Sequence, residues 1–315
     1  AYLNLSWKRQ EATPLVNTDW EVAYDQFVLP VSKNARGYRP DKVGNTTFTV
    51  DKATGALNSL CLDGEELLGS PMTLSLFRPA TDNDNRDQMG AKLWRAAGLD
   101  ALTQKVVSLK ESKTSTTAQV DILNAKGEKV GDATFAYTLN RDGSVKVRTT
   151  FQPDTTLVKS MARLGLTFEV EDAYDHITYL GRGEHETYID RNQSGKIGIY
   201  ETTPERMFHY YVVPQSTGNR TDVRWMKLTD DAGKGCWVES DSPFQFSTIA
   251  FPDVMVEKAR HINELERNGK ITVHLDAKQA GVGTATCGPG VQSQYLVPLT
   301  KQTFDFIIYP VKNRE

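Results

Sequence analysis

Cysteine is scarce in this 315-residue sequence, and its spacing gives no pairing pattern. Cys61, Cys236 and Cys287 are far apart and odd in number, and none stands in a C-x-x-C pair. A disulfide framework and a cysteine-rich zinc site are therefore disfavoured, while a single bridge stays open. The cysteines consequently leave the redox compartment undetermined.

Long apolar runs and an excess of positive charge are missing as well. No stretch approaches the ~20 apolar residues of a membrane-spanning helix, and residues 1–7 lack the basic and apolar parts of a signal peptide. A formal net charge of -3, without any Lys/Arg block, gives no footprint for nucleic acid. We expect a soluble protein without membrane or nucleic-acid partners. Because the sequence begins as if in mid-strand, we also expect a processed protein or a piece of a longer one.

Motifs for catalysis and metal binding are absent too. The five histidines show no metal-ligand spacing such as H-E-x-x-H, and no serine stands in a G-x-S-x-G context. The sequence therefore predicts no metal site and no self-contained hydrolase machinery. The histidines are His176, His185, His209, His261 and His274.

The sequence is instead rich in short alternating segments, which are typical of antiparallel β structure. Four such runs between residues 104 and 151 are separated by Lys-Gly and Asp-Gly turns, and similar runs, among them 235–239 and 245–251, continue to residue 309. Only 91–97 and 255–267 favour a helix, and no ~20 to 50-residue repeat is visible, which disfavours a propeller. We predict an all-β fold in which residues 37–315 form a large antiparallel β-sandwich of two sheets packed face to face.

Residues 1–36 are expected to be separate from that sandwich. Two alternating runs, 2–8 and 20–29, predict two strands, which are marginally stable alone and must pack on something. The polar segment 32–41, with Gly and Pro, predicts a linker.

The densest polar stretch runs from residue 77 to residue 92, directly after an alternating strand at 72–76. Acids and amides at the end of a strand, here Asp82, Asn83 and Asp84, are well placed for a site. The structural alternative is a cap or turn, because Asx side chains hydrogen-bond to nearby backbone. Spacing alone favours the turn.

A second polar cluster, residues 181–191, places two glutamates beside a histidine. A carboxylate next to His185 can tune a group that titrates near neutrality, which suits acid–base work on a sugar. Alternatively, Glu184 and Glu186 point to opposite faces, one paired with arginine and the other solvated. A buried network is as well supported as a site for the remainder of the cluster, because buried charges are normally paired.

Two further loops carry polar or glycine-rich sequence. Residues 214–225 indicate either hydroxyl-recognising groups with a stacking face at Trp225, or a turn with paired charges and a core tryptophan; the second is favoured. Residues 279–290 are rich in glycine but lack Lys and a following helix, which disfavours a phosphate cradle. Cys287 in that loop has no sequence-near base, which favours a packed thiol over a nucleophile.

These clusters occur in one order that resembles a known family. The ordered set comprises Arg78 with 81–84, Trp94 with 97–98, then 181–191, 214–225 and 281–289. In that combination, the sequence from about residue 45 onward resembles the C-terminal small-chain region of family 2 glycoside hydrolases of the bacterial β-galactosidase type. Residues 1–32 resemble the end of the immunoglobulin-like domain that precedes it in the same enzymes.

The resemblance implies a supersandwich fold of the galactose mutarotase-like kind and a longer parent that hydrolyses terminal β-D-galactosides by a retaining mechanism. In such parents a TIM barrel of the same polypeptide carries the two catalytic glutamates and the magnesium and sodium sites, so no cofactor is expected in this chain. We therefore expect a non-catalytic domain that completes the sugar pocket, stabilises the assembly and is inactive alone. Homo-oligomeric assembly of the parent stays open.

The resemblance also implies two sets of residues. The edge of the pocket for the β-galactoside is expected at Asp84, Asn85, Arg86, Asp87 and Cys287. Some members carry a sugar-stacking tryptophan where this sequence has Cys287, so stacking from that loop is not implied here. The buried polar network is expected at Arg78, Asp82, Glu186, Asp190, Arg191, Asn219, Arg220 and Asp222.

Two other functions stay open. A freestanding enzyme of the aldose-1-epimerase type would use a histidine acid and a glutamate base, with Glu186 and either His185 or His274 as candidates. A carbohydrate-binding module would bind galactosides without turnover. Polarimetry of fresh α-galactose tests the first function, and calorimetry with a galactoside tests the second.

Overall fold

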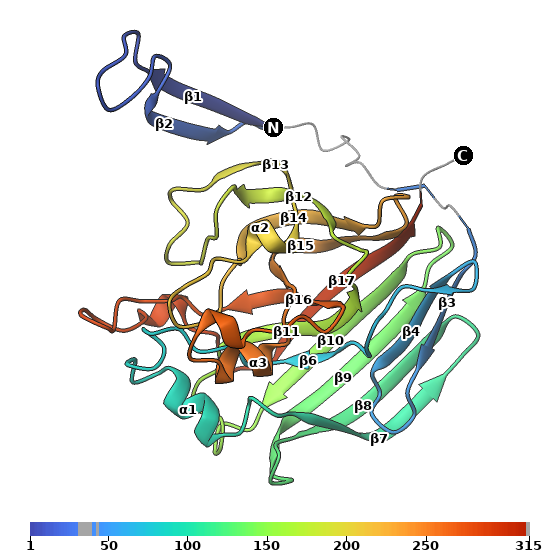
Figure 1. The fold of residues 1–315 in the computed structure, drawn as a ribbon. Helices are drawn as coiled ribbons and strands as arrows, with labels where there is room; N and C mark the ends of the chain where they lie inside the picture. Colours follow the sequence, from blue (N-terminus) through green and yellow to red (C-terminus); the bar gives the residue numbers. More distant parts are fainter. Residues whose placement is uncertain (31–39, 42–43, 313–315) are drawn as a thin grey trace. The chain divides into compact units, whose positions relative to one another are not determined.

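The computed structural model describes residues 1–30, 40–41 and 44–312, and the chain divides into two units, Ala1–Arg39 and Pro40–Glu315 (Figure 1). The boundary predicted between residues 36 and 37, and most of the predicted linker 32–41, lie outside the described residues. The first unit contains one antiparallel hairpin of β1 (Tyr2–Lys8) and β2 (Glu21–Val28). Its apolar side chains stay accessible, with Trp7 and Val22 more than half exposed.

The second unit is built almost entirely from antiparallel strands. Among the described residues its main sheet has twelve strands, nine of which follow the order β13–β12–β14–β15–β17–β10–β9–β8–β7. The predicted all-β antiparallel class is confirmed. These nine strands are β7 (Thr103–Glu111), β8 (Ser115–Leu123), β9 (Lys129–Leu139), β10 (Val145–Pro153), β12 (His176–Gly183), β13 (Lys196–Thr202), β14 (Arg220–Thr229), β15 (Gly235–Ile249) and β17 (Gln302–Val311).

One long strand, β15, connects the two layers of the sandwich. Its residues 235–239 pair with β17, whereas residues 245–249 pair with β16 (Lys270–Gln279). β16 in turn pairs with β11 (Arg163–Glu171), and β11 pairs with β6 (Thr73–Ser75). The sequence predicted two strands here, at 235–239 and 245–251, because polar residues 240–243 interrupt the apolar pattern. They form one strand, and residues 241–243 are exposed where it passes from one pairing partner to the other.

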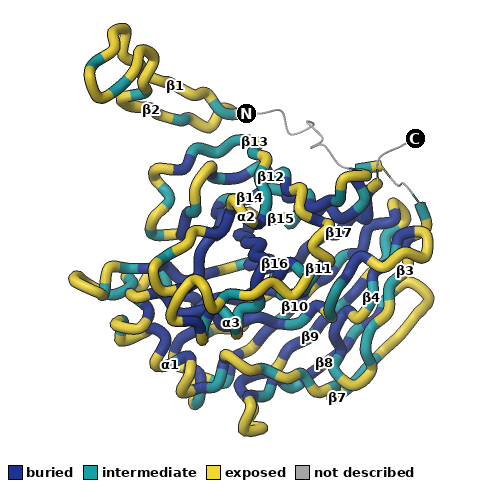
Figure 2. The backbone as a smooth tube through the Cα atoms, in the orientation of Figure 1, coloured by how far each residue is buried: buried dark blue, intermediate teal, exposed yellow. Residues whose placement is uncertain are grey.

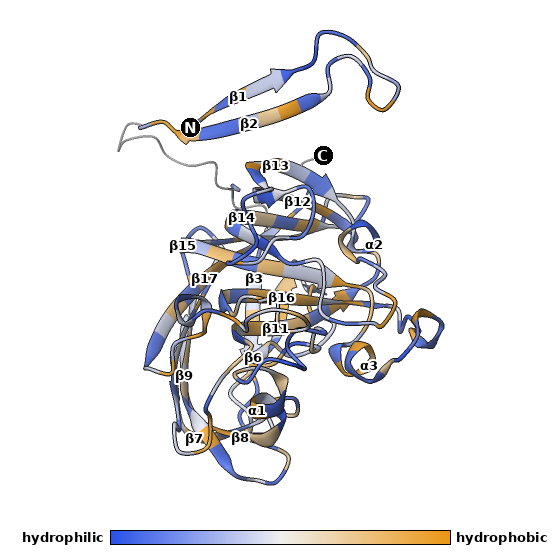
Figure 3. Cartoon of the chain, turned by 90° about the vertical axis from the view of Figure 1, so that its left-hand side faces the viewer, coloured by the Kyte–Doolittle hydropathy of each residue, from blue (hydrophilic) through white to orange (hydrophobic). Residues whose placement is uncertain are grey.

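The two layers enclose a single large core. Phe135 and Phe151 from β9 and β10 belong to the same buried cluster as Leu166 and Leu275 from β11 and β16. In Figure 2 the buried backbone runs through the middle of the strands, and in Figure 3 the strands alternate between apolar and polar residues. This alternation is the period of 2 that places one face of a strand inward.

Short elements complete the second unit. A small sheet consists of β3 (Thr46–Val50), β4 (Leu57–Leu62) and β5 (Glu65–Glu66). The helices are α1 (Ala91–Ala96), α2 (Pro204–Met207), α3 (Asp253–Lys258) and the 3-10 turns η1 (Ile262–Glu264) and η2 (Ser293–Tyr295). None of those in the described part of the chain is long and apolar enough to cross a membrane.

Two local predictions need correction. A helix over 255–267 is wrong, because α3 ends at Lys258 and Ala259 adopts an extended conformation with ψ of 139°. The exposed residues 260–264 supply no apolar face that would continue the helix. Strand β13 escaped prediction because it lies at the end of the sheet order and its residues are half-buried or exposed, which leaves no buried alternation to detect.

Candidate functional site

Arg78 is the centre of a buried polar network just after β6. Its guanidinium donates two hydrogen bonds to Asp84, of 3.0 and 2.7 Å, and further ones to the backbone oxygens of Ala280 (2.7 Å) and Gly281 (2.8 Å). Burial alone would lower the pKa of Arg78, but the attraction of Asp84 outweighs it and the net pKa lies above the ordinary value. Arg78 thus ties the loop after β6 to the start of the glycine-rich loop, about 200 residues later.

Asp84 closes the turn that holds its own loop. Its carboxylate also accepts the Thr81 backbone N–H at 2.9 Å, while the Thr81 hydroxyl accepts the Asp84 N–H at 3.1 Å. Asp84 is 1% exposed, so of the two roles predicted for it, geometry places it in the network. Asp82 is exposed, and its backbone N–H donates to the Gln215 side chain at 3.1 Å.

Residues 82–91 and 281–291 form one continuous surface, which we call the loop surface. The Asn83 amide donates to the Gly283 oxygen at 2.9 Å and accepts the Thr286 backbone N–H at 3.0 Å. Asp87 accepts the Val291 N–H at 2.7 Å. Side chains exposed on this surface include Asn85, Arg86 and Cys287.

The exposed side chains of the loop surface differ in whether they have hydrogen-bond partners within the protein. The Asn85 side chain is held, since its amide donates to the Thr81 oxygen and its carbonyl accepts from Arg95. The Arg86 guanidinium has no polar partner among the described residues. Cys287 lies in a tight turn in which its N–H donates to the Thr284 oxygen. Arg86 is therefore available to a ligand.

Asp190 holds the glycine-rich loop from its other side. Its two oxygens accept the backbone N–H groups of Val282 (3.0 Å) and Gly283 (2.8 Å). A Cβ atom on Gly281 would stand 2.4 Å from this carboxylate. Glycine is required at this position because a side chain would prevent the close approach of Asp190.

Glu186 is saturated with hydrogen bonds. Its Oε1 accepts from Arg191 (2.6 Å) and the Tyr211 hydroxyl (2.5 Å), and its Oε2 accepts from Thr217 and the Gly218 N–H, both at 2.9 Å. Burial alone would raise the pKa of Glu186, but these donors outweigh it, so the net pKa lies below its ordinary value. The carboxylate fastens the 181–191 segment to the loop before β14.

The remaining residues of the predicted network lie at the N-terminal end of β14. Asn219 donates to the Thr187 oxygen and to Gln245, and Arg220 donates to the Tyr179 hydroxyl at 2.9 Å. Asp222 accepts from Arg182. Sequence reasoning missed several partners, although Asn83 stood in the polar run that it singled out. The missed residues are Asn83, Asp87 as a loop anchor, Tyr211, Gln215 and Gln279.

The candidate acid–base groups have other partners. The His185 ring is exposed and bonds to Ser194 at 2.7 Å, and the His274 ring is 1% exposed and bonds to Asp253 at 3.1 Å. Among the described residues, neither histidine contacts Glu186. The described side chains also include no group of three or more His, Cys, Asp or Glu residues that could hold a metal ion.

A second buried ion pair joins β11 to β16. Arg163 and Asp276 are 2% and 0% exposed, and their closest nitrogen and oxygen atoms are 3.7 Å apart. Two nitrogens of Arg163 and one oxygen of Asp276 have no hydrogen-bond partner among the described residues. This pair is therefore much less well satisfied by the protein than Arg78 and Asp84.

Comparisons with known proteins agree on one family. The family model described as beta galactosidase small chain matches residues 42–308 of this sequence. A β-galactosidase of Priestia megaterium is 30% identical, over 89% of this chain and 28% of its own length. Those of Actinobacillus pleuropneumoniae (23% identical, 93% and 30% covered) and Kluyveromyces lactis (29%, 82% and 26%) are similar too. The chain spans less than a third of the length of these relatives.

Among solved structures, a GalM/aldose epimerase homologue from C. elegans superposes with a TM-score of 0.49 at 12% identity, covering 86% of this chain and 97% of that chain. The family match extends over most of the sequence, from the small sheet of β3 to β17, and includes every segment of the buried network described above. The chain belongs to the beta galactosidase small chain family.

Proposed function

We propose that this chain is a non-catalytic C-terminal domain of a longer β-galactosidase, in which the loop surface forms one edge of the pocket for a terminal β-D-galactoside. The proposal is supported by the family match and by relatives that are more than three times as long as the matched region. Three side chains, Asn83, Asp87 and Asp190, fix the backbone of the loop surface while Arg86 stays free. A fixed backbone with a free donor is suited to orienting sugar hydroxyls.

The proposal that this domain is non-catalytic is supported mainly by the hydrogen bonds that its carboxylates already accept. A retaining glycosidase needs two carboxyl groups ~5–5.5 Å apart, of which one acts as nucleophile and the other has a raised pKa. Glu186, Asp84 and Asp190 instead accept hydrogen bonds from fixed donors, and the pKa of Glu186 lies below its ordinary value. Each is committed to holding loops together.

The chemistry would then come from the remainder of the polypeptide. We assign the two catalytic glutamates, and the magnesium and sodium sites, to a TIM-barrel domain outside residues 1–315. Residues 1–36 would be the last strands of a preceding immunoglobulin-like domain. In the reaction, this chain would bind and orient the sugar and exclude water from one side of the pocket.

Two experiments test this proposal. The coding sequence upstream of Ala1 should encode a catalytic domain, and a reading frame that begins just before Ala1 would contradict the proposal. In the full-length protein, Arg86→Ala should raise KM for a β-galactoside about three- to tenfold, which corresponds to one hydrogen bond. Arg141→Ala, an equally exposed arginine in the β9–β10 turn, is the matched control and should leave KM unchanged.

A further inference from the structure

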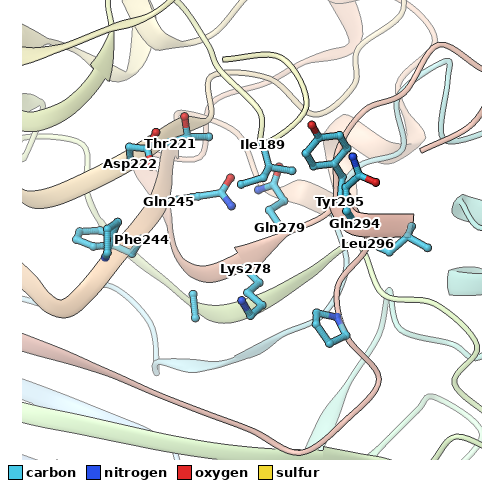
Figure 4. Close-up of a pocket in the computed structure, with 13 residues that line it drawn as sticks. Ile189, Thr221, Asp222, Phe244, Gln245, Lys278, Gln279, Gln294, Tyr295 and Leu296 are labelled. Carbon is cyan, nitrogen blue, oxygen red and sulfur yellow. The ribbon is translucent and has the colours of Figure 1, made fainter. Parts of the chain in front are cut away.

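A cavity of about 250 Å³ opens between β14, β15, β16 and the segment 294–298 (Figure 4). None of the residues 82–91 or 281–291 lines it, so it is distinct from the loop surface. Pockets for drug-sized ligands measure roughly 300–1,000 Å³, so a cavity of this size suits a smaller molecule.

Gln245 is an unsatisfied polar group in the wall of this cavity. The residue is 7% exposed, and its Oε1 accepts the Asn219 amide at 2.8 Å. Its Nε2 carries two N–H donors and has no hydrogen-bond partner among the described residues. Figure 4 shows the Gln245 and Gln279 side chains converging beneath Ile189. An amide that lacks protein partners on the cavity side can donate to a ligand with acceptor oxygens.

The wall behind Gln245 is held rigidly. Gln279 donates to Asp276 at 3.1 Å, and its oxygen accepts from Arg78 at 3.2 Å. Asn219, which binds Gln245, donates also to the Thr187 oxygen at 2.9 Å. These contacts orient both glutamines before any ligand arrives, which lowers the entropic cost of binding.

The rim adds both hydrogen-bond donors and hydrogen-bond acceptors. Asp222 has φ of 53° although it is not glycine, a strained conformation that often marks functional sites. Its carboxylate is held by Arg182 and remains about one-third exposed. Lys278 and Tyr295 line the cavity, and neither polar head has a partner among the described residues. Because Arg182 already compensates the charge of Asp222, Lys278 adds a positively charged hydrogen-bond donor to the rim.

We propose that this cavity binds a small polyhydroxylated molecule of monosaccharide size, with Gln245 and Lys278 donating to ligand oxygens and Asp222 accepting from a hydroxyl. The cavity walls consist of residues of this chain alone. Binding therefore requires no catalytic domain and does not depend on the function proposed above.

The test uses the 315-residue chain, with D-galactose and D-glucose as probes and glycerol as the control for unspecific polyol effects. We expect saturable binding with Kd on the order of 1 mM. Backbone amide shifts in two-dimensional NMR should cluster at 221–222, 244–245, 277–279 and 294–296. Gln245→Met should weaken binding about three- to tenfold through loss of the amide, whereas Gln119→Met, on the exposed face of β8, should not.

Two more variants test whether weaker binding by Gln245→Met results from misfolding. Lys278→Met removes an exposed group with no contact to the core and should also weaken binding, while Ala277→Phe fills the cavity and should abolish it. Saturation by neither sugar would overturn the inference and leave the proposed function standing on its own KM test. Sugar-induced shifts confined to residues 82–91 and 281–291 would also overturn it, because the ligand would then bind the loop surface.

Discussion

Two buried arginine–carboxylate pairs, Arg78–Asp84 and Arg163–Asp276, differ sharply in how the protein surrounds them. Both pairs are at least 98% buried. Arg78 contacts both oxygens of Asp84 and reaches three more acceptors, whereas Arg163 and Asp276 are 3.7 Å apart with three polar atoms lacking protein partners. A buried pair stabilises a fold only when good geometry and additional hydrogen bonds offset the loss of hydration.

The difference indicates what each pair does. Arg78 and Asp84 join segments 200 residues apart and so position the loop surface. Arg163 and Asp276 lie on the neighbouring strands β11 and β16, which the β11–β16 ladder already joins along residues 163–171 and 270–279. We therefore expect that the stability of the fold depends on Arg78 and Asp84, whereas apolar residues can replace Arg163 and Asp276.

The largest expected effect comes from breaking the first pair. Asp84→Ala leaves a buried, uncompensated guanidinium and should lower the free energy of unfolding by about 3–5 kcal/mol. Urea unfolding monitored by tryptophan fluorescence measures this. Asp82→Ala, two residues away and exposed, is the control and should change stability by less than about 0.5 kcal/mol. Equal losses in both variants would contradict the role given to Asp84.

Replacing both partners sharpens the comparison. Arg163→Met with Asp276→Val should cost no more than about 1 kcal/mol, because two poorly satisfied charges leave the interior together and only Gln279 loses a hydrogen-bond partner. Arg78→Met with Asp84→Val should cost about 2 kcal/mol or more, since the Thr81 N–H and the carbonyls of Ala280 and Gly281 lose their partners. Denaturant titration of both double variants decides the matter. The opposite ranking would refute the distinction.

Glu186 extends the comparison to a pH dependence. Its pKa is lower in the folded chain than its ordinary value of 4.5, so its stabilisation is fully present above that pH and is lost as pH falls through the folded pKa. Glu186→Gln should cost about 1–3 kcal/mol near neutrality, because an amide cannot accept from all four donors. The gap from the wild type should shrink below pH 4.5. The exposed Glu184→Gln variant serves as control, and a gap independent of pH would rule out the linkage.

The smallest expected effect is local. Asp190→Asn keeps one acceptor and loses the other, which should weaken the anchoring of the glycine-rich loop by about 1 kcal/mol. Amide hydrogen exchange should therefore become faster at residues 282–291 while the β9 and β10 amides stay protected. Unchanged exchange in that loop would show that Asp190 does not hold it.

The sequence predicted the class of fold well because strand alternation and Gly turns are local signals. The helix predicted over 255–267 failed where the apolar face stops after Lys258, and β13 lacks the buried alternation that reveals a strand. The continuity of β15 could not be foreseen, because residues 240–243 interrupt the apolar pattern and the two parts on either side pair with different strands, β17 and β16.

The sequence predicted several of the residues that belong to the site, but it did not predict their hydrogen-bond partners. The motif order identified Arg78, Glu186 and Asp190 as notable, yet several of their partners lie 32 to 203 residues away and depend on how the sheet assembles. For Glu186 the sequence left acid–base chemistry and a buried network equally open. Donors from the loop before β14 decide for the network.

The most direct measurement is an assay of the purified 315-residue chain with an aryl β-D-galactoside, with release of the phenol followed against buffer. If this chain is a non-catalytic domain, no hydrolysis should exceed the buffer rate, and Glu186→Gln should change nothing. Saturable hydrolysis that Glu186→Gln abolishes would contradict the proposed function, because it would make Glu186 a catalytic group.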